Sequence, residues 1–150
     1  MANNDGLNRH LDHVQLSDAE SVWCVTIDID HFKVMNDSLG PDSGDTLLRQ
    51  VAERIEQASQ NGDFIARPSA DEFILFWHGH DQANLEQLLQ DLHSLLNQPT
   101  TINNRQFSFS TSIGVAKSPE HGDTLRALKQ HASVALLNAK KLGRNQIHWY

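Results

Sequence analysis

Four carboxylates stand at the ends of two strand-like runs, where their spacing suits metal chemistry. Asp28 and Asp30 lie at the end of VWCVTIDI (22–29) and just after it, while Asp71 and Glu72 lie in RPSADEF (67–73). Because strand side chains alternate, Asp28 and Asp30 are expected on one face, and a hairpin beside that strand would bring Asp71 close to Asp28. Two carboxylates with a backbone carbonyl and waters suit Mg²⁺. Local sequence alone favours the plainer alternative, in which these acids cap a helix or face solvent.

Hydrophobic periodicity predicts the elements that must position these acids. The β-branched run at 22–29 and the apolar run at 72–77 are typical of buried strands, and FIAR (64–67) forms a hairpin with the second. Amphipathic helices are predicted from Pro41 towards a stop at Gly62, from Leu85 to Leu96 before Pro99, and from Leu125 to Ala139.

The remaining segments are predicted as strands. Asn103 and Asn104 favour a hairpin turn before the run at 107–115, which alternates with its apolar residues on one face, and QIHWY (146–150) can close as an edge strand. This order predicts an α+β fold with a mainly antiparallel central sheet flanked by helices.

Length and composition limit the classes of function. The 150 residues suit a single domain, 1–150, with 1–20 as a lead-in segment, and a domain cut from a longer multidomain protein is also compatible with this length. A net charge of −7 argues against a nucleic-acid partner, so a nucleotide would need a few placed cations and a metal. The lone Cys24, together with the absence of an apolar leader or membrane-length stretch, predicts a cytoplasmic protein with no direct membrane contact.

Four ordered motifs resemble those of the GGDEF family of diguanylate cyclases. They are DIDHFKVMNDSLGPDSGD (28–45), RPSADEF (67–73), STSIGVA (110–116) and AKKLGRN (139–145), and residues 6–9 look like a shortened form of the family's GLxNR entry motif. The resemblance spans nearly the whole chain and implies a βαββαβ palm-like core, as in nucleotidyl cyclases. It implies that two GTP molecules become cyclic di-GMP across a head-to-head homodimer, with Mg²⁺ assisting.

The resemblance also assigns roles to the carboxylates. Asp28, Asp71 and the carbonyl of Ile29 match the family's metal ligands, while Asp71 and Glu72 match its catalytic signature acids. On this basis Asp30 is interpreted only as a neighbour that caps the next helix.

Five further residues match the family's nucleotide contacts. Asn36 and Asp45 match its guanine readers, and an amide with a carboxylate can satisfy the guanine edge. Lys33, Lys140 and Arg144 match its triphosphate contacts, although each alone would be interpreted as ordinary surface charge.

The chain departs from the family pattern in its signature turn and its inhibitory motif. Ser69 and Ala70 replace the two signature glycines, and Gln60 replaces the arginine of the inhibitory RxxD motif while Asp63 remains. A two-residue hairpin turn would force positive φ on Ser69 and Ala70, at a cost of roughly 1–2 kcal/mol. Their side chains would also take space from the triphosphate, and misplacing a reacting phosphate by about 1 Å can cost on the order of 10²-fold in rate.

Three hypotheses follow. In the first, a degenerate GGDEF domain binds GTP with Mg²⁺, has weak or no cyclase activity, and regulates a partner or an attached phosphodiesterase or sensor domain. The second is an active diguanylate cyclase. The third is another Mg²⁺-dependent nucleotidyl transferase with a palm-like sheet.

Overall fold

The computed structural model describes residues 1–16, 21–59, 63–79 and 82–150. The strands are β1 (Val22–Ile29), β2 (Phe64–Ala66), β3 (Glu72–His78), β4 (Thr100–Ile102), β5 (Arg105–Phe107), β6 (Thr111–Lys117) and β7 (Ile147–Trp149). The helices are α1 (Asn4–His13), α2 (Phe32–Leu39), α3 (Pro41–Ala58), α4 (Gln82–Leu96) and α5 (Leu125–Lys141).

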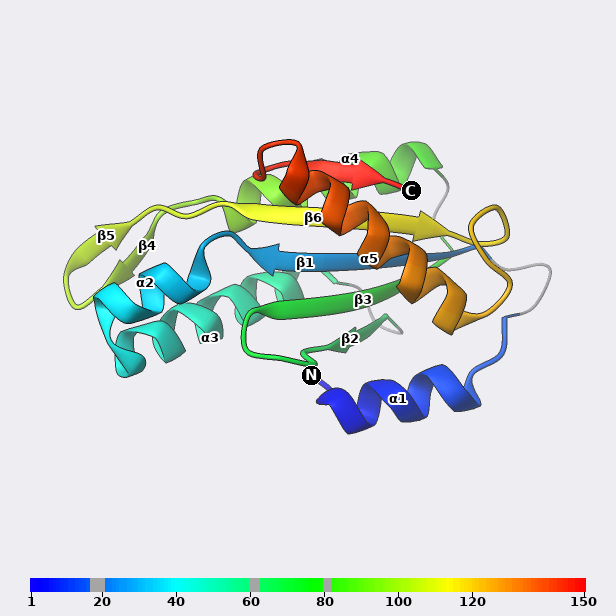
Figure 1. Cartoon of the computed structure of the whole chain (residues 1–150), viewed down its shortest axis with the longest axis horizontal. Coiled ribbons are helices and arrows are strands. Elements are labelled where there is room, and N and C mark those ends of the chain that lie inside the picture. The colour runs from blue at the N-terminus through cyan, green and yellow to red at the C-terminus, as the bar shows by residue number, and fades with distance from the viewer. Residues whose placement is uncertain (17–20, 60–62, 80–81) are drawn as a thin grey trace.

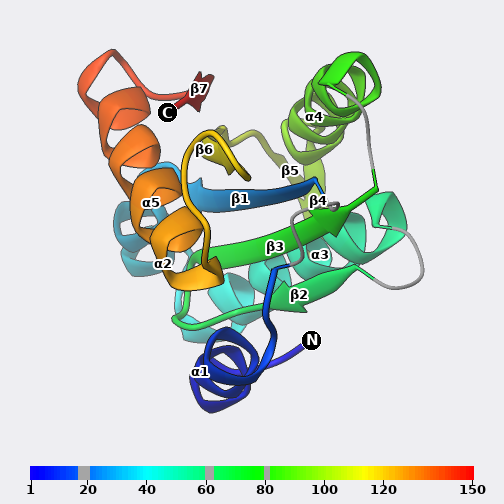
Figure 2. The same ribbon diagram turned by 90° about the vertical axis from the view of Figure 1, so that its right-hand side faces the viewer.

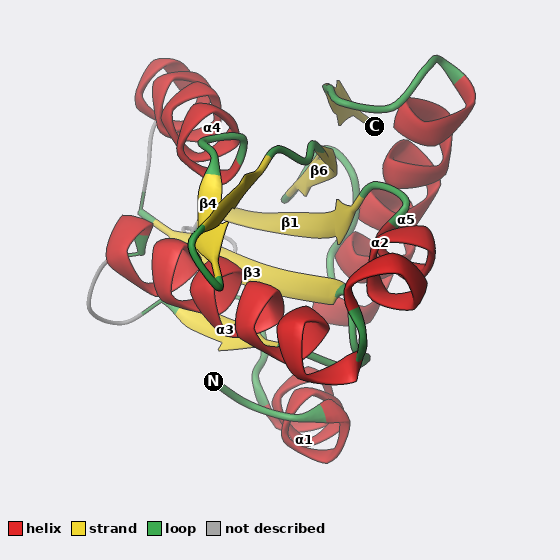
Figure 3. Cartoon of the chain, turned by 90° about the vertical axis from the view of Figure 1, so that its left-hand side faces the viewer, coloured by secondary structure: helices red, strands yellow, loops and turns green. Residues whose placement is uncertain are grey.

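A five-stranded sheet forms the middle layer of the molecule (Figure 1). Its strand order is β2-β3-β1-β6-β7, and every neighbouring pair is antiparallel except β6 with β7. Helices α1 and α5 cover one face while α3 and α4 cover the other (Figures 2 and 3), and each face has its own buried apolar cluster. The predicted α+β class, with a mainly antiparallel sheet flanked by helices, is confirmed.

Several predicted element boundaries are also confirmed. Pro41 is the first residue of α3, where a missing N–H costs nothing, and α4 ends at Leu96 before Pro99. Asn103 and Asn104 both adopt positive φ, 52° and 64°, in the turn between β4 and β5. Helix α3 ends at Ala58, and its expected stop at Gly62 lies outside the described residues.

Two helices were not predicted. Helix α1 begins where the Asn3 side chain accepts a hydrogen bond from the Gly6 amide (2.9 Å), and it buries Leu7 and Leu11 one turn apart. Helix α2 has eight residues and buries only Phe32, so it shows too few apolar positions for a helical period.

The prediction of one alternating strand over 107–115 is wrong. The chain forms β5 up to Phe107, leaves the strand pattern at 108–110, and forms β6 from Thr111. Residues 111–116 are all buried, because helices cover both faces of the sheet at β6. Polar residues such as Ser112 therefore lie inside the fold and require partners there.

Among the described residues, no helix is long and apolar enough to cross a membrane.

Candidate active site

The ends of β1 and β3 bring the predicted metal carboxylates together. In the antiparallel register Asp28 lies directly opposite Glu72, and the Ile29 amide donates to the Asp71 carbonyl (3.3 Å). The hairpin therefore runs beside β1 as expected, with the difference that Glu72, not Asp71, is the direct cross-strand neighbour of Asp28. The ligand role of the Ile29 carbonyl stays a prediction.

Lys140 supplies a cation to this cluster. Its ammonium pairs with the carboxylate of Asp28, whose side chain is 14% exposed. Burial raises the pKa of Asp28, the hydrogen bond and charge of Lys140 oppose that rise, and the nearby carboxylates of Asp71 and Glu72 add to it. Three carboxylates stand against the single ammonium of Lys140, so the cluster favours a second positive charge beside Asp28.

Close packing of α5 on the sheet explains why Lys140 reaches Asp28. A Cβ on Gly114 of β6 would lie 2.3 Å from both the Ala132 carbonyl oxygen and the Leu136 nitrogen, so only glycine allows this approach. The Thr26 hydroxyl lies 3.3 Å from the carbonyl oxygens of Gly114 and Ala132. Helix α5 is therefore fixed on β1 and β6, with its last turn above the carboxylates.

Asp30 does not cap α2, and that interpretation is wrong. The cap position belongs to His31, which makes no side-chain cap hydrogen bond. The Asp30 carboxylate is buried and turns towards β6 and the turn after α5. The sequence carried a signal for this, because Ser110 and Ser112 are two residues apart in a run with strand-like alternation.

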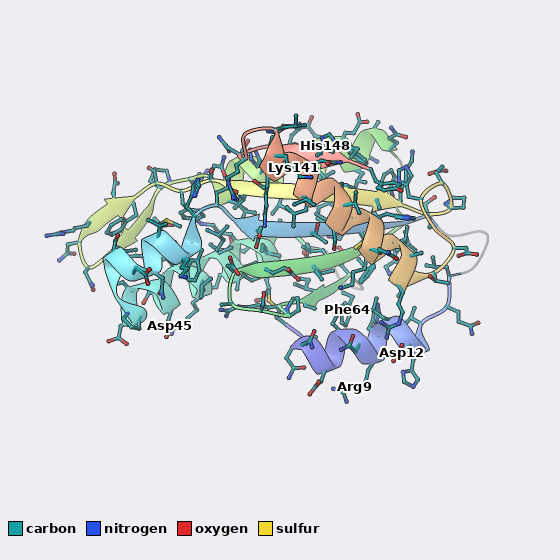
Figure 4. All side chains as sticks on the ribbon, in the orientation of Figure 1. Arg9, Asp12, Asp45, Phe64, Lys141 and His148 are labelled. Carbon is teal, nitrogen blue, oxygen red and sulfur yellow. The ribbon has the colours of Figure 1, made fainter. Side chains whose placement is uncertain are left out.

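A second group of predicted residues lies on α2 and α3. A Cβ on Gly44 would lie 1.9 Å from Oδ1 of Asn36, so the bare glycine provides the space that the Asn36 amide occupies. Asp45, the next residue, is exposed (Figure 4). It lines a cleft of about 620 Å³ together with Arg49, Ser69 and Ala70. Asp45, one of the two proposed guanine readers, therefore lies in a cleft that reaches the signature turn, and Asn36 contacts Gly44 next to it.

The signature turn differs from the expected tight hairpin. Five residues, 67–71, connect β2 to β3, and neither Ser69 nor Ala70 is among the described residues with positive φ. The expected backbone strain is therefore wrong, because a connection this long does not need a two-residue primed turn. Instead the Arg67 Nε donates to the Ala70 carbonyl (3.0 Å) and holds the turn.

The remaining predicted residues that the structure describes are not among those that contact the Asp28 carboxylate or line the cleft. Lys33 is exposed on the first turn of α2, and Arg144 is partly exposed in the turn after α5. Gln60 lies outside the described residues, and Asp63 is half-buried just before β2.

By donor type, Asp28 and Asp71 suit a divalent cation. Their carboxylate oxygens are the hard donors that Mg²⁺ prefers, and the pairing of β1 with the start of β3 brings the two residues near each other. Their metal-binding and nucleotide-binding roles stay predictions.

Comparison with known proteins agrees with this arrangement. The family described as "Diguanylate cyclase, GGDEF domain" matches residues 2–146. The chain is 34% identical over 147 residues to the cyclic di-GMP phosphodiesterase PdeR of Escherichia coli, covering 97% of this chain and 22% of PdeR. The chain thus spans about a fifth of the length of the curated relatives it matches.

Two solved structures share the fold over nearly the whole chain. The GGDEF domain of YfiN or TpbB from Pseudomonas aeruginosa has a TM-score of 0.89 at 28% identity, covering 99% of this chain and 96% of that chain. An EAL/GGDEF domain protein from M. capsulatus has a TM-score of 0.86 at 36% identity, covering 96% and 93%.

Proposed function

This chain belongs to the GGDEF domain family, and from that premise we propose that it is a GTP- and Mg²⁺-binding regulatory domain of cyclic di-GMP signalling. In this proposal its diguanylate cyclase activity is weak or absent. Residues 1–150 act as one GGDEF domain within a longer protein, attached to a phosphodiesterase or sensor domain. The phosphodiesterase name of PdeR and the EAL/GGDEF description of the M. capsulatus protein support such an attachment.

One observation carries the proposal: Ser69 and Ala70 line the same cleft as Asp45. The base-reading residue and the two substituted signature positions therefore face one space. Side chains at 69 and 70 occupy volume that glycines would leave to the nucleotide, while the carboxylates and cations beyond them are retained. We therefore expect nucleotide binding to be retained and cyclase activity to be weakened or lost.

The roles divide between the two groups of residues. Asn36 and Asp45 bind the guanine edge, and Lys33, Lys140 and Arg144 bind the triphosphate. Asp28 and Asp71 would hold Mg²⁺, which would neutralise phosphate charge. When nucleotide binds, the Lys140 side chain would exchange its ion pair with Asp28 for one with a phosphate oxygen, and Asp28 would then be available to hold the metal.

Titration calorimetry tests the binding half of the proposal. We expect weak GTP binding that disappears without Mg²⁺, is much poorer for ATP, and is lost in Asn36→Ala. Lys141→Ala, an exposed residue beside the site, is the matched control and keeps wild-type affinity. Equal affinity for ATP and GTP, or no GTP binding at millimolar concentration, contradicts the proposal.

An active cyclase is the second candidate, favoured by the retained Asp28–Lys140 pair and by Asp71. The reaction needs two subunits facing each other, so concentrated protein must be incubated with GTP and Mg²⁺ and analysed for cyclic di-GMP. Product at many turnovers per hour, abolished by Asp71→Ala, supports the cyclase over the regulatory domain. No observation favours a different nucleotidyl transferase over the family's own reaction.

A further inference from the structure

Asp30 is a buried acid with no role in the site described above. Its residue is 3% exposed, and among the described residues it is the only charged one that is buried. Burying a carboxylate is costly unless hydrogen bonds and a nearby positive charge compensate. The contacts of Asp30 therefore indicate what the fold gains from it.

Those contacts join three separate segments. Oδ1 accepts a hydrogen bond from the Ser112 hydroxyl (2.6 Å), while Oδ2 accepts from the Ser110 hydroxyl (2.6 Å) and the Asn145 amide (3.0 Å). The Arg144 guanidinium lies 3.8 Å from Oδ1. Asp30 thus ties the end of β1 to the start of β6 and to the turn that follows α5.

That turn has an unusual backbone. Arg144 and Asn145 both have a left-handed conformation, with φ of 63° and 49°. Asparagine tolerates this region, but arginine rarely adopts it, and such conformations persist only where surrounding contacts hold them. The Asn145 amide on Asp30 is one such contact, and the Asn97 side chain, which donates to Oδ1 of Asn145 (2.7 Å), is another.

The turn is also closed at both ends. The Arg144 amide donates to the Ala139 carbonyl (2.9 Å) at the end of α5, and the Ile113 amide donates to the Gln146 carbonyl (2.9 Å) where the chain returns to the sheet. These hydrogen bonds fix the backbone of Arg144, and its guanidinium lies near Asp30 at the end of β1. Arg144 comes from the same end of α5 as Lys140.

We propose that Asp30 is a positioning residue for Arg144, acting through the left-handed turn 144–145. In this role Asp30 binds neither metal nor nucleotide. It holds the Arg144 guanidinium near the end of β1, and hence sets where a triphosphate is held. The inference rests on the proposed function for the ligand, but its structural half concerns the turn alone.

A double-mutant cycle on Mg·GTP affinity tests the coupling to the ligand. Asp30→Asn keeps the size of the side chain, and Arg144→Asn removes the cation while tolerating the left-handed backbone. We expect each variant to weaken GTP binding about tenfold, and the double variant to be no weaker than the weaker single. A double variant about a hundredfold weaker, or unchanged affinity in Asp30→Asn, overturns the proposal.

Hydrogen exchange at the Asn145 amide tests the turn without any ligand. Thr26→Val is the matched control, because it removes a buried hydroxyl of β1 that contacts α5 at Ala132 and not at the turn 144–145. The two variants are compared under conditions that give them the same free energy of unfolding. Asp30→Asn should then accelerate exchange of the Asn145 amide at least about tenfold more than Thr26→Val does. Equal acceleration in the two variants reduces Asp30 to a general stabilising residue and overturns the proposal.

Two outcomes separate this inference from the proposed function. If the wild-type domain binds no GTP, the proposed function fails, and selective loosening of Asn145 still supports the positioning role. If Asp30→Asn does not fold, Ser110→Ala removes one hydrogen bond from the same carboxylate oxygen. It should then accelerate Asn145 exchange by about fivefold, and no acceleration contradicts the proposal.

Discussion

The ammonium of Lys140 at the end of α5 is paired with the carboxylate of Asp28 at the end of β1. The pair joins β1 to α5, the helix that Gly114 of the neighbouring strand β6 allows to pack closely on the sheet. It puts one positive charge where a divalent cation would bind. On the proposed function, the Lys140 ammonium and the metal ion would compete for the Asp28 carboxylate until Lys140 binds a phosphate of the nucleotide.

Lys140→Met tests this competition, since methionine keeps much of the aliphatic stem and removes the charge. Without nucleotide, Mg²⁺ affinity should rise by about threefold or more, because the competing ammonium is gone. With Mg²⁺ present, GTP affinity should fall about tenfold, because a phosphate contact is lost. Calorimetric titrations of each ligand measure both effects, and Lys141→Met is the control. Equal changes of Mg²⁺ and GTP affinity in Lys140→Met and Lys141→Met would contradict the competition.

Restoring the signature glycines tests the steric effect of the turn. The double change Ser69→Gly and Ala70→Gly should raise cyclic di-GMP production at least about tenfold, about 1.4 kcal/mol of barrier. Because neither residue has a left-handed backbone, the same change should lower the free energy of unfolding, by roughly 0.5–1 kcal/mol per glycine. Adding Asp71→Ala should erase the gain in activity. Increased stability would show that strain, not space, is the defect, and unchanged activity would place the defect beyond the turn.

Gly44→Ala tests the fit between α2 and α3. The added methyl would displace the Asn36 amide, so GTP affinity should fall about tenfold. Helix stability should not fall, since alanine is favoured over glycine inside a helix by about 1 kcal/mol. Ser43→Ala, one residue earlier, should bind GTP normally. If Asn36→Ala weakens binding equally in the wild-type and Gly44→Ala backgrounds, the two residues act independently and the prediction is wrong.

Inhibition of this domain by cyclic di-GMP bound at the inhibitory motif should be absent. Gln60 lacks the guanidinium fork that binds phosphates in the family's inhibitory motif, so labelled cyclic di-GMP should show no saturable binding that Asp63→Ala abolishes. Gln60→Arg should create such binding beside the retained Asp63. A tight wild-type site that is sensitive to Asp63→Ala would reverse this conclusion.

Acidification should destabilise the fold through His10. Its ring stacks on Phe64 with centroids 3.7 Å apart, and its Nε2 is buried without a hydrogen-bond partner among the described residues (Figure 4 labels Phe64). Burial, and secondarily the charge of His78, lower the pKa of His10 from its usual 6.5. The unfolded chain therefore binds the proton first, and the stability contributed by neutral His10 is lost as pH falls below about 6.5.

His10→Phe keeps the stacking and removes both the titration and the unpaired nitrogen. Urea unfolding at pH 7.5 and 5.5 should show a smaller loss of stability on acidification than in the wild type. His13→Gln changes an exposed histidine on the same helix and should retain the wild-type loss. Identical pH dependence in wild type and His10→Phe would remove His10 from the explanation.

The sequence predicts most of the sheet and three of the helices, because their apolar residues follow a clear period. It also predicts that Asp28 and the RPSADEF acids meet, because they stand at the ends of strands that pair. The turn at Ser69 and Ala70 was predicted wrongly, since its conformation depends on loop length and on Arg67. The partners of Asp30 lie 80, 82 and 115 residues away, and only the assembled fold brings them together.

Gly114 also affects how variant data for this domain should be interpreted. It lies on β6, away from the cleft beside the signature turn, yet any side chain there would meet the backbone of α5. A screen of random variants scored by the proposed binding of GTP with Mg²⁺ should therefore mark position 114 as intolerant, together with Asp28 and Asp71. The yield of folded protein would separate the two groups, because variants at 114 disrupt the fold, whereas variants of the two acids should disrupt only the proposed binding.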